Sequence, residues 1–273
     1  MTGGGMIHEY SLFATEGLTL HNSAKIDWYN YRSTEAPLKV GTNSTDAAAI
    51  VLYNSACING DVAVGAGGNP DDVIERKNSA RYTGWAYAQS ANHETPAASV
   101  PAYLAAGPRG SQIDSNRTIT TSGKYTSINL GNSEKVIING DVELYVTGNV
   151  SLGNSAEIQV NEGSSLVLYV DGNVTGNNSS KFNNRTRDPR CLKLYGSSTC
   201  SSISLKNSGD MYAIVYAPTA ELTLNNSATI WGSVTSRSCA LKNSAAVYYD
   251  ASLRAHQDPA FTGSLRLSSW REY

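Results

Sequence analysis

The residue types that most often carry chemistry are sparse in this sequence and lie far apart. The four histidines show no spacing that would hold a metal ion, and no two cysteines are separated by two residues. The serines lack the Gly-x-Ser-x-Gly turn of a hydrolase nucleophile, and the chain has no glycine-rich phosphate-binding loop. We therefore expect no metal and no other cofactor. The histidines are His8, His21, His93 and His256.

Two groups of charged residues were compared with the needs of polysaccharide cleavage, which are paired carboxylates or a Ca²⁺ site beside a basic residue. Asp71 and Asp72 follow an Asn-Pro pair, which is typical of a solvated turn. The second group, three arginines and one aspartate near residue 188, can form ion pairs among its own members and needs no ligand to balance its charge. Both patterns favour a structural role, and we expect the protein not to be an enzyme. The second group is Arg185, Arg187, Asp188 and Arg190.

The four cysteines leave the redox state open. Cys191 and Cys200 flank the hairpin-sized loop "LKLYGSST", where a disulfide would staple a protruding segment. Cys57 and Cys239 lie beside Asn-Ser pairs in different parts of the chain. The sequence is also consistent with four free thiols.

The composition is typical of a turn-rich β protein. The 273 residues carry 21 basic and 23 acidic side chains, and 40% of the residues are hydrophobic. This balance lacks the basic stripe of a nucleic-acid-binding protein. No apolar run reaches the roughly 18 residues of a membrane span. The first residues, "MTGGGMIHEY", lack the features of a signal peptide, so export would need a segment that precedes them.

An Asn-Ser pair recurs along the chain inside a repeated pattern. In "LTLNNSATI" and "VSLGNSAEI", apolar residues stand four and two positions before the Asn, and another stands four after it. From Asn132 onward, successive pairs are 22, 24, 29, 19 and 17 residues apart. A repeat of roughly 20 residues with period-2 alternation is typical of one β-solenoid coil. The pairs begin at Asn22, Asn54, Asn78, Asn132, Asn154, Asn178, Asn207, Asn226 and Asn243.

We interpret each Asn-Ser pair as a corner between two strands. A corner often needs a residue with positive φ, which costs little for Gly and next least for Asn or Asp. Stacked coils place Asn above Asn, so that their amides can hydrogen-bond along the stack. The predicted fold is all-β, a single-stranded parallel β-helix with coils of about 17–29 residues, Asn-Ser corners and a short C-terminal helical cap.

One solenoid domain is predicted over residues 1–273. The alternation fails at about 85–120, which contains three prolines, and again at about 182–200, so we expect external excursions at both places. The segment 250–273 is interpreted as a cap over the open end of the solenoid, with Asp250 at the start of a short helix and Leu253 facing inward.

Tyrosine is the main aromatic residue, with 16 Tyr against 3 Phe. Outward Tyr and Trp side chains suit sugar stacking or protein contacts, whereas Tyr is also an ordinary half-buried strand residue. The expected contact surface consists of Trp28, Tyr29, Tyr31, Tyr248 and Tyr249.

Several stretches of the chain resemble the β-solenoid domain of PilX-like pilus-assembly, or minor-pilin-like, bacterial proteins. They are "YSLFATEGLTLHNSAKID" (10–27), "VELYVTGNVSLGNSAEI" (142–158), "MYAIVYAPTAELTLNNSATIWGSVTSRSCALKNSAAVYYDASL" (211–253) and "SSWRE" (268–272). The corner of that family is usually Gly-Asn-Ala, so Asn226 stands at the position of the Gly. The membrane helix of the family is absent from this chain, and the resemblance implies no catalytic residue.

The resemblance implies a non-enzymatic, surface-exposed domain that serves as a structural or adhesive part of a pilus-like or secreted filament. Its partners would be proteins of that assembly or further copies of itself, with a surface glycan as another ligand. It would reach a membrane only through a segment absent from this chain. A second hypothesis is a cytoplasmic, self-polymerising solenoid similar to bactofilin, although a C-terminal cap would block such stacking. A third is a polysaccharide-binding or polysaccharide-cleaving β-helix.

Overall fold

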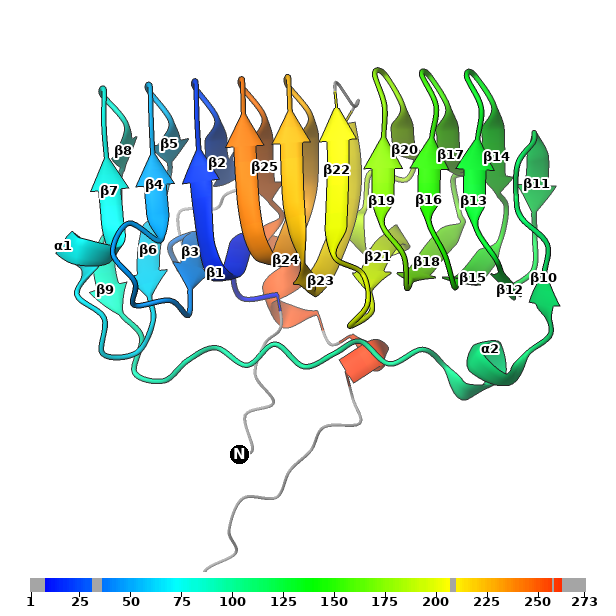
Figure 1. Ribbon diagram of the computed structural model, residues 1–273, viewed down its shortest axis with the longest axis horizontal. Helices are drawn as coiled ribbons and strands as arrows, with labels where there is room; N and C mark the ends of the chain where they lie inside the picture. The colour runs from blue at the N-terminus through cyan, green and yellow to red at the C-terminus, as the bar shows by residue number, and fades with distance from the viewer. Residues whose placement is uncertain (1–7, 31–35, 207–209, 257, 262–273) are drawn as a thin grey trace, which may run out of the picture.

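The computed structural model describes residues 8–30, 36–206, 210–256 and 258–261, and it confirms the predicted parallel β-solenoid. The strand pairings among these residues are parallel, and the coils follow one another along the long axis of the molecule (Figure 1). The cross-section has three sides, which we call the front face, the rear face and the base. Most coils contribute one strand to each side, and the long strands β23 and β24 bend through all three.

The strands of each side are as follows. The front face contains β1 (Leu12–Leu20), β4 (Ile50–Leu52), β7 (Ile74–Arg76), β13 (Ile128–Leu130), β16 (Val150–Leu152), β19 (Val174–Gly176), β22 (Ser202–Lys206), β23 (Asp210–Asn225) and β24 (Thr229–Lys242). The rear face contains β2 (Lys25–Trp28), β5 (Cys57–Ile58), β8 (Arg81–Tyr82), β11 (Arg117–Ile119), β14 (Lys135–Ile138), β17 (Glu157–Val160), β20 (Lys181–Asn184) and β25 (Ala246–Tyr249), together with the first parts of β23 and β24. The base contains β3 (Lys39–Thr42), β6 (Asp61–Val64), β9 (Ala86–Ala88), β10 (Arg109–Gly110), β12 (Gly123–Tyr125), β15 (Asp141–Val146), β18 (Ser165–Val170) and β21 (Leu192–Gly196), together with parts of β1, β23 and β24.

Period-2 alternation builds the core, because successive side chains of a strand point to opposite sides. In β1 the side chains of Leu18 and Leu20 are 2% and 0% exposed, while Thr19 between them is only half-buried. Each fully buried aliphatic side chain of this kind contributes about 1.5–3 kcal/mol. The alanines that follow the corners are also buried, because the interior is narrow there; they are Ala24, Ala56, Ala156, Ala228 and Ala245.

The order of the coils in space is not their order along the chain. Residues 8–88 form an N-terminal module at one end, and residues 109–256 form a C-terminal module that makes up the rest. The first coil of the N-terminal module stacks on the last coil of the C-terminal module, because β1 pairs with β24 and β2 pairs with β25. We call this contact the seam. Figure 1 shows the connector, residues 89–108, running outside the base from β9 to β10.

The two predicted excursions have different outcomes. Within 85–120, residues 89–108 run outside the coils and include the short helix α2 (Ala102–Ala106). The expectation for 182–200 was wrong, since this segment contains the end of β20, the 3-10 helix η1 (Pro189–Cys191) and β21. All five residues of β21 are buried, so the strand lacks the polar alternation by which a coil is recognised in sequence.

The described part of the predicted cap, residues 250–256 and 258–261, does not cover an end of the solenoid, which corrects the prediction for these residues. The 3-10 helix η2 (Ala251–Ala255) begins at Asp250, whose carboxylate accepts from the Ser252 N–H at 2.9 Å, and Leu253 is buried. It follows β25, however, which is flanked by β24 and β2 at the seam. The last 3-10 helix, η3 (Pro259–Phe261), packs Phe261 against Tyr216 of the base. The end strands therefore lie elsewhere, with β7 to β9 beside the helix α1 (Pro70–Val73) at one end and β10 and β11 at the other (Figure 1).

Candidate binding face

The front face carries a row of short outward side chains, one from each strand. In each repeat except the one that contains Glu75, the residue three positions before the corner Asn stands between two inward residues, so its side chain points outward. The parallel register places these residues side by side across the whole face. In spatial order the row is Asn129, Ser151, Thr175, Ser204, Thr223, Ala240, Thr19, Val51 and Glu75.

A second row lies two residues earlier in each repeat and has the same character. Direct pairings place Ser202, Glu221, Ser238 and Gly17 in line. The Asn149 side-chain oxygen accepts from the Asn173 N–H of the next coil at 2.9 Å, which continues the row. The full row is Ser127, Asn149, Asn173, Ser202, Glu221, Ser238, Gly17 and Ala49.

The two rows form a long, regular and nearly uncharged strip on the front face, while the exposed cations Arg76, Lys206 and Lys242 lie at the ends of its strands, beside the corners. Adjacent strands are about 4.7–4.9 Å apart, so the row from Asn129 to Glu75 extends over about 38 Å. Glu75 and Glu221 are the charged members of the two rows. Short hydroxyl and amide side chains both donate and accept hydrogen bonds, and they lose little rotamer entropy when a ligand immobilises them. The face can therefore match a flat partner whose own hydrogen-bonding groups repeat.

A shallow hollow interrupts the front face at the seam. Its volume is about 230 Å³, and its lining includes Gly17, Thr19, Ser238 and Ala240. Gly17 is required there, because a Cβ at its φ of 154° would lie 2.3 Å from the Ala49 carbonyl oxygen. Cys239 also lines the hollow, and burial raises the pKa of its thiol, so that it stays protonated at neutral pH.

Charged and aromatic side chains occupy the rear face instead. Tyr212, Trp231 and Tyr248 stack in register, with neighbouring ring centroids 5.6 and 4.3 Å apart. Tyr29 packs edge-on against Trp231 at 5.0 Å. Rings that stack on one another present edges to solvent, so this row offers no flat platform for a sugar. The sequence analysis named Tyr29 and Tyr248 but missed Tyr212 and Trp231, which complete this aromatic cluster.

The remaining predicted contact residues do not join that row. Tyr249 is fully buried and its hydroxyl donates to the His8 carbonyl oxygen at 2.5 Å, so its assignment to the outer surface was wrong. Neighbouring residues of a strand point to opposite sides, and only Tyr248 of the pair can face outward. Trp28 is half-buried against Tyr249, with the Arg254 guanidinium 5.1 Å above its ring. Tyr31 lies outside the described residues.

The Asn-Ser corners are of two kinds. In the first kind both the Asn and the Ser have positive φ, as in a type I′ turn, and the Asn amides form a ladder. Asn54 Nδ2 donates to Asn22 Oδ1 at 2.8 Å, and Asn22 Nδ2 donates to Asn243 Oδ1 at 2.8 Å. This kind occurs at Asn22, Asn54, Asn78, Asn226 and Asn243.

In the second kind only the Ser has positive φ, which differs from the expectation that the Asn supplies it. A turn of type II needs a left-handed residue only at its second central position, and Ser133, Ser155 and Ser179 occupy that position here. These corners begin at Asn132, Asn154 and Asn178. Asn207 lies outside the described residues.

Beneath the base, a buried polar cluster joins residues from both ends of the chain. The Asp258 carboxylate accepts from the Tyr195 hydroxyl and lies 3.1 Å from Lys193 Nζ and 3.6 Å from His8 Nε2. Ser233 Oγ lies 3.3 Å from His8 Nδ1. These are the residue types of a hydrolase triad, yet Ser233 and His8 are only 3% and 2% exposed, so a substrate cannot reach the hydroxyl. The cluster acts as a lock between the two modules.

The charges of this cluster follow from its burial and its contacts. Burial alone would raise the pKa of Asp258, but the interactions with His8 and Tyr195 and the charge of Lys193 outweigh it and hold that pKa well below its usual range. Burial raises the pKa of Tyr195, and the adjacent carboxylate adds to the effect. His256 Nε2 lies 3.8 Å from the Asp258 carboxylate, and burial, helped by the charge of Lys193, lowers the pKa of His256. At neutral pH the lock therefore contains an ionised Asp258 and a neutral His256.

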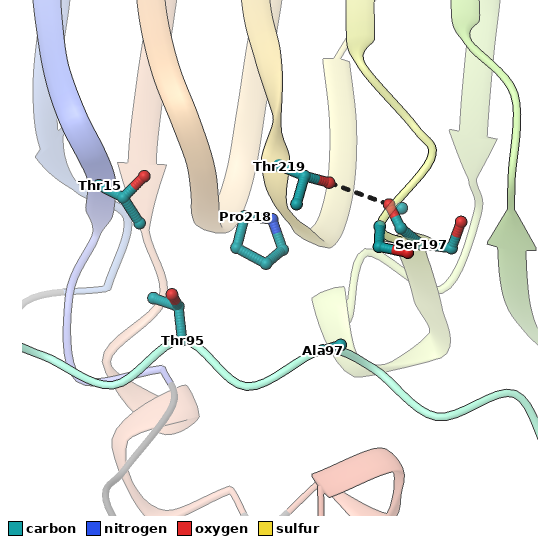
Figure 2. Close-up of a pocket in the computed structure, with 8 residues that line it drawn as sticks. Thr15, Thr95, Ala97, Ser197, Pro218 and Thr219 are labelled. Carbon is teal, nitrogen blue, oxygen red and sulfur yellow. Dashed lines mark hydrogen bonds between the residues drawn. The ribbon is translucent and has the colours of Figure 1, made fainter.

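Figure 2 shows a second hollow, of about 230 Å³, where the connector passes over the base. Thr95 and Ala97 of the connector stand opposite Pro218 and Thr219. Thr219 Oγ1 donates to the Ser197 carbonyl oxygen at 3.0 Å. The lining consists of short hydroxyl side chains, apolar side chains and glycine, so this hollow has no group for acid–base chemistry.

The four cysteines are free, so of the two alternatives that the sequence left open, the structure has the free thiols and not the disulfide between Cys191 and Cys200. The two residues lie at opposite ends of β21, which at about 3.3 Å per residue separates them by roughly 16 Å. A disulfide needs Cα atoms within about 7 Å. Cys57 and Cys239 lie on different sides of the solenoid, in β5 and β24.

The remaining candidates from the sequence make local contacts. Asn69 caps α1, where its side chain accepts from the Asp71 N–H at 3.2 Å, so Asp71 and Asp72 lie in a solvated helical turn. Arg190 pairs with Asp188 at 2.6 Å.

Among the described residues, no group of three or more His, Cys, Asp or Glu could hold a metal ion. No helix in the described part of the chain has the length and hydropathy of a membrane span.

Comparisons with known proteins were made for the sequence and for the fold. A family model described as a domain of unknown function (DUF7305) matches residues 86–256. No curated protein matches the sequence. Among solved structures, an ice-binding protein from the Antarctic ascomycete Antarctomyces psychrotrophicus is similar, with 12% identity, a TM-score of 0.38, and coverage of 90% of this chain and 96% of that one.

Proposed function

We propose that this chain, which belongs to the family described as a domain of unknown function (DUF7305), is a non-enzymatic adhesive module that binds a flat, repeating surface. The resemblance to minor-pilin-like proteins suggests a place for it at the cell surface, in a pilus-like or secreted filament. The ligand of this proposal is an insoluble, uncharged surface rich in hydroxyl groups, such as a crystalline polysaccharide or ice.

The observation that carries the proposal is the row of outward side chains from Asn129 to Glu75, which continues from strand to strand along the front face. This row places one outward side chain on each strand of the face, and the hydrogen bonds between the parallel strands fix the spacing of these side chains. Many weak contacts to one rigid surface then act together, because each contact after the first forms at high effective concentration. A dissolved sugar would engage only one or two of these positions, so we expect binding to solids and weak binding to short oligosaccharides.

Pull-down with insoluble particles tests this function. We expect the protein to bind crystalline cellulose, crystalline chitin or ice, and the Thr223→Lys variant to lose at least about tenfold in affinity, because a long cation would hold a flat surface away from the row. The matched control is Thr118→Lys, which places the same change on an exposed residue of the rear face. Equal binding by the two variants, at equal melting temperature, would refute a role for the front face.

End-to-end stacking of solenoids is a second candidate function. The strands β7, β8 and β9 each pair with a neighbour on one side only, and such edges can template pairing with another chain. Trp85 at this end is 81% exposed and favours contact with another solenoid. The exposed cations Arg76 and Arg81 on the same edge oppose it, because they would have to lose water. Negative-stain microscopy of the purified protein tests this candidate, since stacking gives filaments and a purely adhesive module gives single particles.

A further inference from the structure

The seam repeats the contacts that join neighbouring coils inside each module. β1 pairs with β24 through seven residue pairs, in the same parallel arrangement by which it pairs with β3 and β4 on its other side. The Asn ladder crosses the seam without a change in geometry, because Asn22 donates to Asn243 at the same 2.8 Å at which Asn54 donates to Asn22. The edge of the C-terminal module is therefore a ready-made site for the N-terminal module.

Several contacts make this site specific for the N-terminal module of this chain. Arg237 Nη1 pairs with Glu16 Oε2 at 2.8 Å across the seam. Asn30 Nδ2 donates to Asp250 Oδ1 at 2.8 Å, and Asn30 Oδ1 accepts from the Ala251 N–H at 2.9 Å. Complementary charges and paired amides of this kind discriminate against coils that lack them.

The connector is long enough to let a module join its own chain, with limited slack. Its roughly 20 residues can reach at most about 66–72 Å. The base places ten strand-to-strand steps between β10 and β9, which at about 4.8 Å each require about 48 Å. Most connector residues are exposed or half-buried, and the contacts that hold the connector against the coils are mainly single hydrogen bonds, such as that from the Tyr216 hydroxyl to the Pro96 carbonyl oxygen, together with the pair of bonds between Asn43 and His93.

We infer that the seam is an exchangeable interface, at which the C-terminal module takes the N-terminal module either from its own chain or from a second copy. Reciprocal exchange gives a closed dimer with two complete solenoids. One-way exchange, repeated from copy to copy, gives an open chain of solenoids joined by connectors. The partner of the seam is thus another copy of the same protein, and this inference does not depend on the front face.

Shortening the connector provides the first test. Deletion of residues 94–103 leaves about 10 connector residues, whose reach of about 33–36 Å is too short for the distance along the base. We expect this variant to be dimeric or larger by light scattering, with a circular dichroism spectrum equal to that of the parent. A matched control replaces the same ten residues by Gly and Ser at unchanged length and should remain monomeric. A folded, monomeric deletion variant would overturn the inference.

A charge-exchange experiment with the full-length chain tests whether copies exchange modules at the seam, even if the deletion variant does not fold. Arg237→Glu and Glu16→Arg each place like charges across their own seam, whereas a reciprocally exchanged heterodimer of the two variants restores an attractive pair at both seams. After joint unfolding and refolding, native mass spectrometry should find at least about threefold more dimer in the mixture than in either variant alone. Equal amounts of dimer in the three samples would contradict the inference.

Discussion

The Asn ladder gives the most direct test of how the corners stabilise the fold, and Asn22→Ala is its most informative variant. Asn22 has a φ of 53°, accepts a hydrogen bond from Asn54 and donates one to Asn243. Alanine in the left-handed region costs about 1–2 kcal/mol. Each lost amide bond costs about 0.5 kcal/mol, at the low end of the usual range because water can replace the partner at an exposed corner. We therefore expect the free energy of unfolding to fall by about 2–3 kcal/mol.

Two further variants separate the backbone contribution from the hydrogen bonds. Asn22→Gly keeps the left-handed corner and loses only the amide bonds, so we expect a loss of about 1 kcal/mol. Asn154→Ala changes a corner whose Asn does not have positive φ, and its backbone N–H keeps the bond to Asn132 Oδ1. For this control we expect a loss below about 1 kcal/mol.

Urea unfolding followed by circular dichroism measures these differences. A loss of 2–3 kcal/mol corresponds to a fall in melting temperature of about 4–6 °C for a chain of this size. The expected order of destabilisation is Asn22→Ala first, then Asn22→Gly, then Asn154→Ala. The reasoning fails if Asn22→Gly is as unstable as Asn22→Ala, because the positive φ would then cost nothing.

Three other properties follow from the buried parts of the molecule. Asp258→Asn leaves Lys193 without its carboxylate, so we expect a loss of about 3 kcal/mol at pH 7. Because the folded-state pKa of Asp258 is lowered, its stabilisation is present above the unfolded-state pKa of about 3.9 and is lost as the pH falls toward the folded-state pKa; urea unfolding curves of parent and variant should converge only below about pH 3. Gly67→Ala, at a φ of 80° with open space around it, should cost only the backbone strain of about 1–2 kcal/mol, whereas Gly17→Ala adds the clash with the Ala49 carbonyl to a positive φ and should be more destabilising by about 1–3 kcal/mol in the same measurement. Alkylation of the denatured, unreduced protein should add four labels by mass spectrometry, and only two labels would restore the disulfide.

The repeat makes the coil predictable from sequence, but it does not determine how the coils are ordered. Inward residues and corners recur in every unit, so "LTLNNSATI" already contains one strand, its corner and the start of the next strand. The pairing of β1 with β24 joins residues more than 200 positions apart. Since every coil offers the same backbone hydrogen-bonding edge, and the partner of Glu16 is known only from the fold, nothing local in "LFATEGLTL" shows that this strand follows the last coil of the other module.

The residues of the front face can be identified in the sequence, at the position three residues before each corner Asn. Their role in binding cannot be inferred from the sequence. Short polar residues such as Thr19 and Ser151 are ordinary on the solvent side of a strand, so the pattern by itself does not distinguish a binding surface. Their alignment becomes visible only with the register of all the coils. The lock around Asp258 could not be predicted for a different reason, because His8 reaches Asp258 from the other end of the chain, across the contact between the two modules.

Different positions of the repeat carry different tasks, and this separation has consequences for how the protein can change. Inward positions build the core, the Asn-Ser pair turns the chain, and the residue three positions before the Asn faces the proposed ligand. A substitution such as Thr223→Lys can then alter adhesion without a loss of stability, while Asn22→Ala lowers stability without touching the front rows. Far-apart substitutions of these two kinds should add, because they share no contact. Exchange at the seam lengthens the assembly and changes neither the stability of the corners nor the adhesive surface, since every coil in an exchanged assembly still presents the same front row.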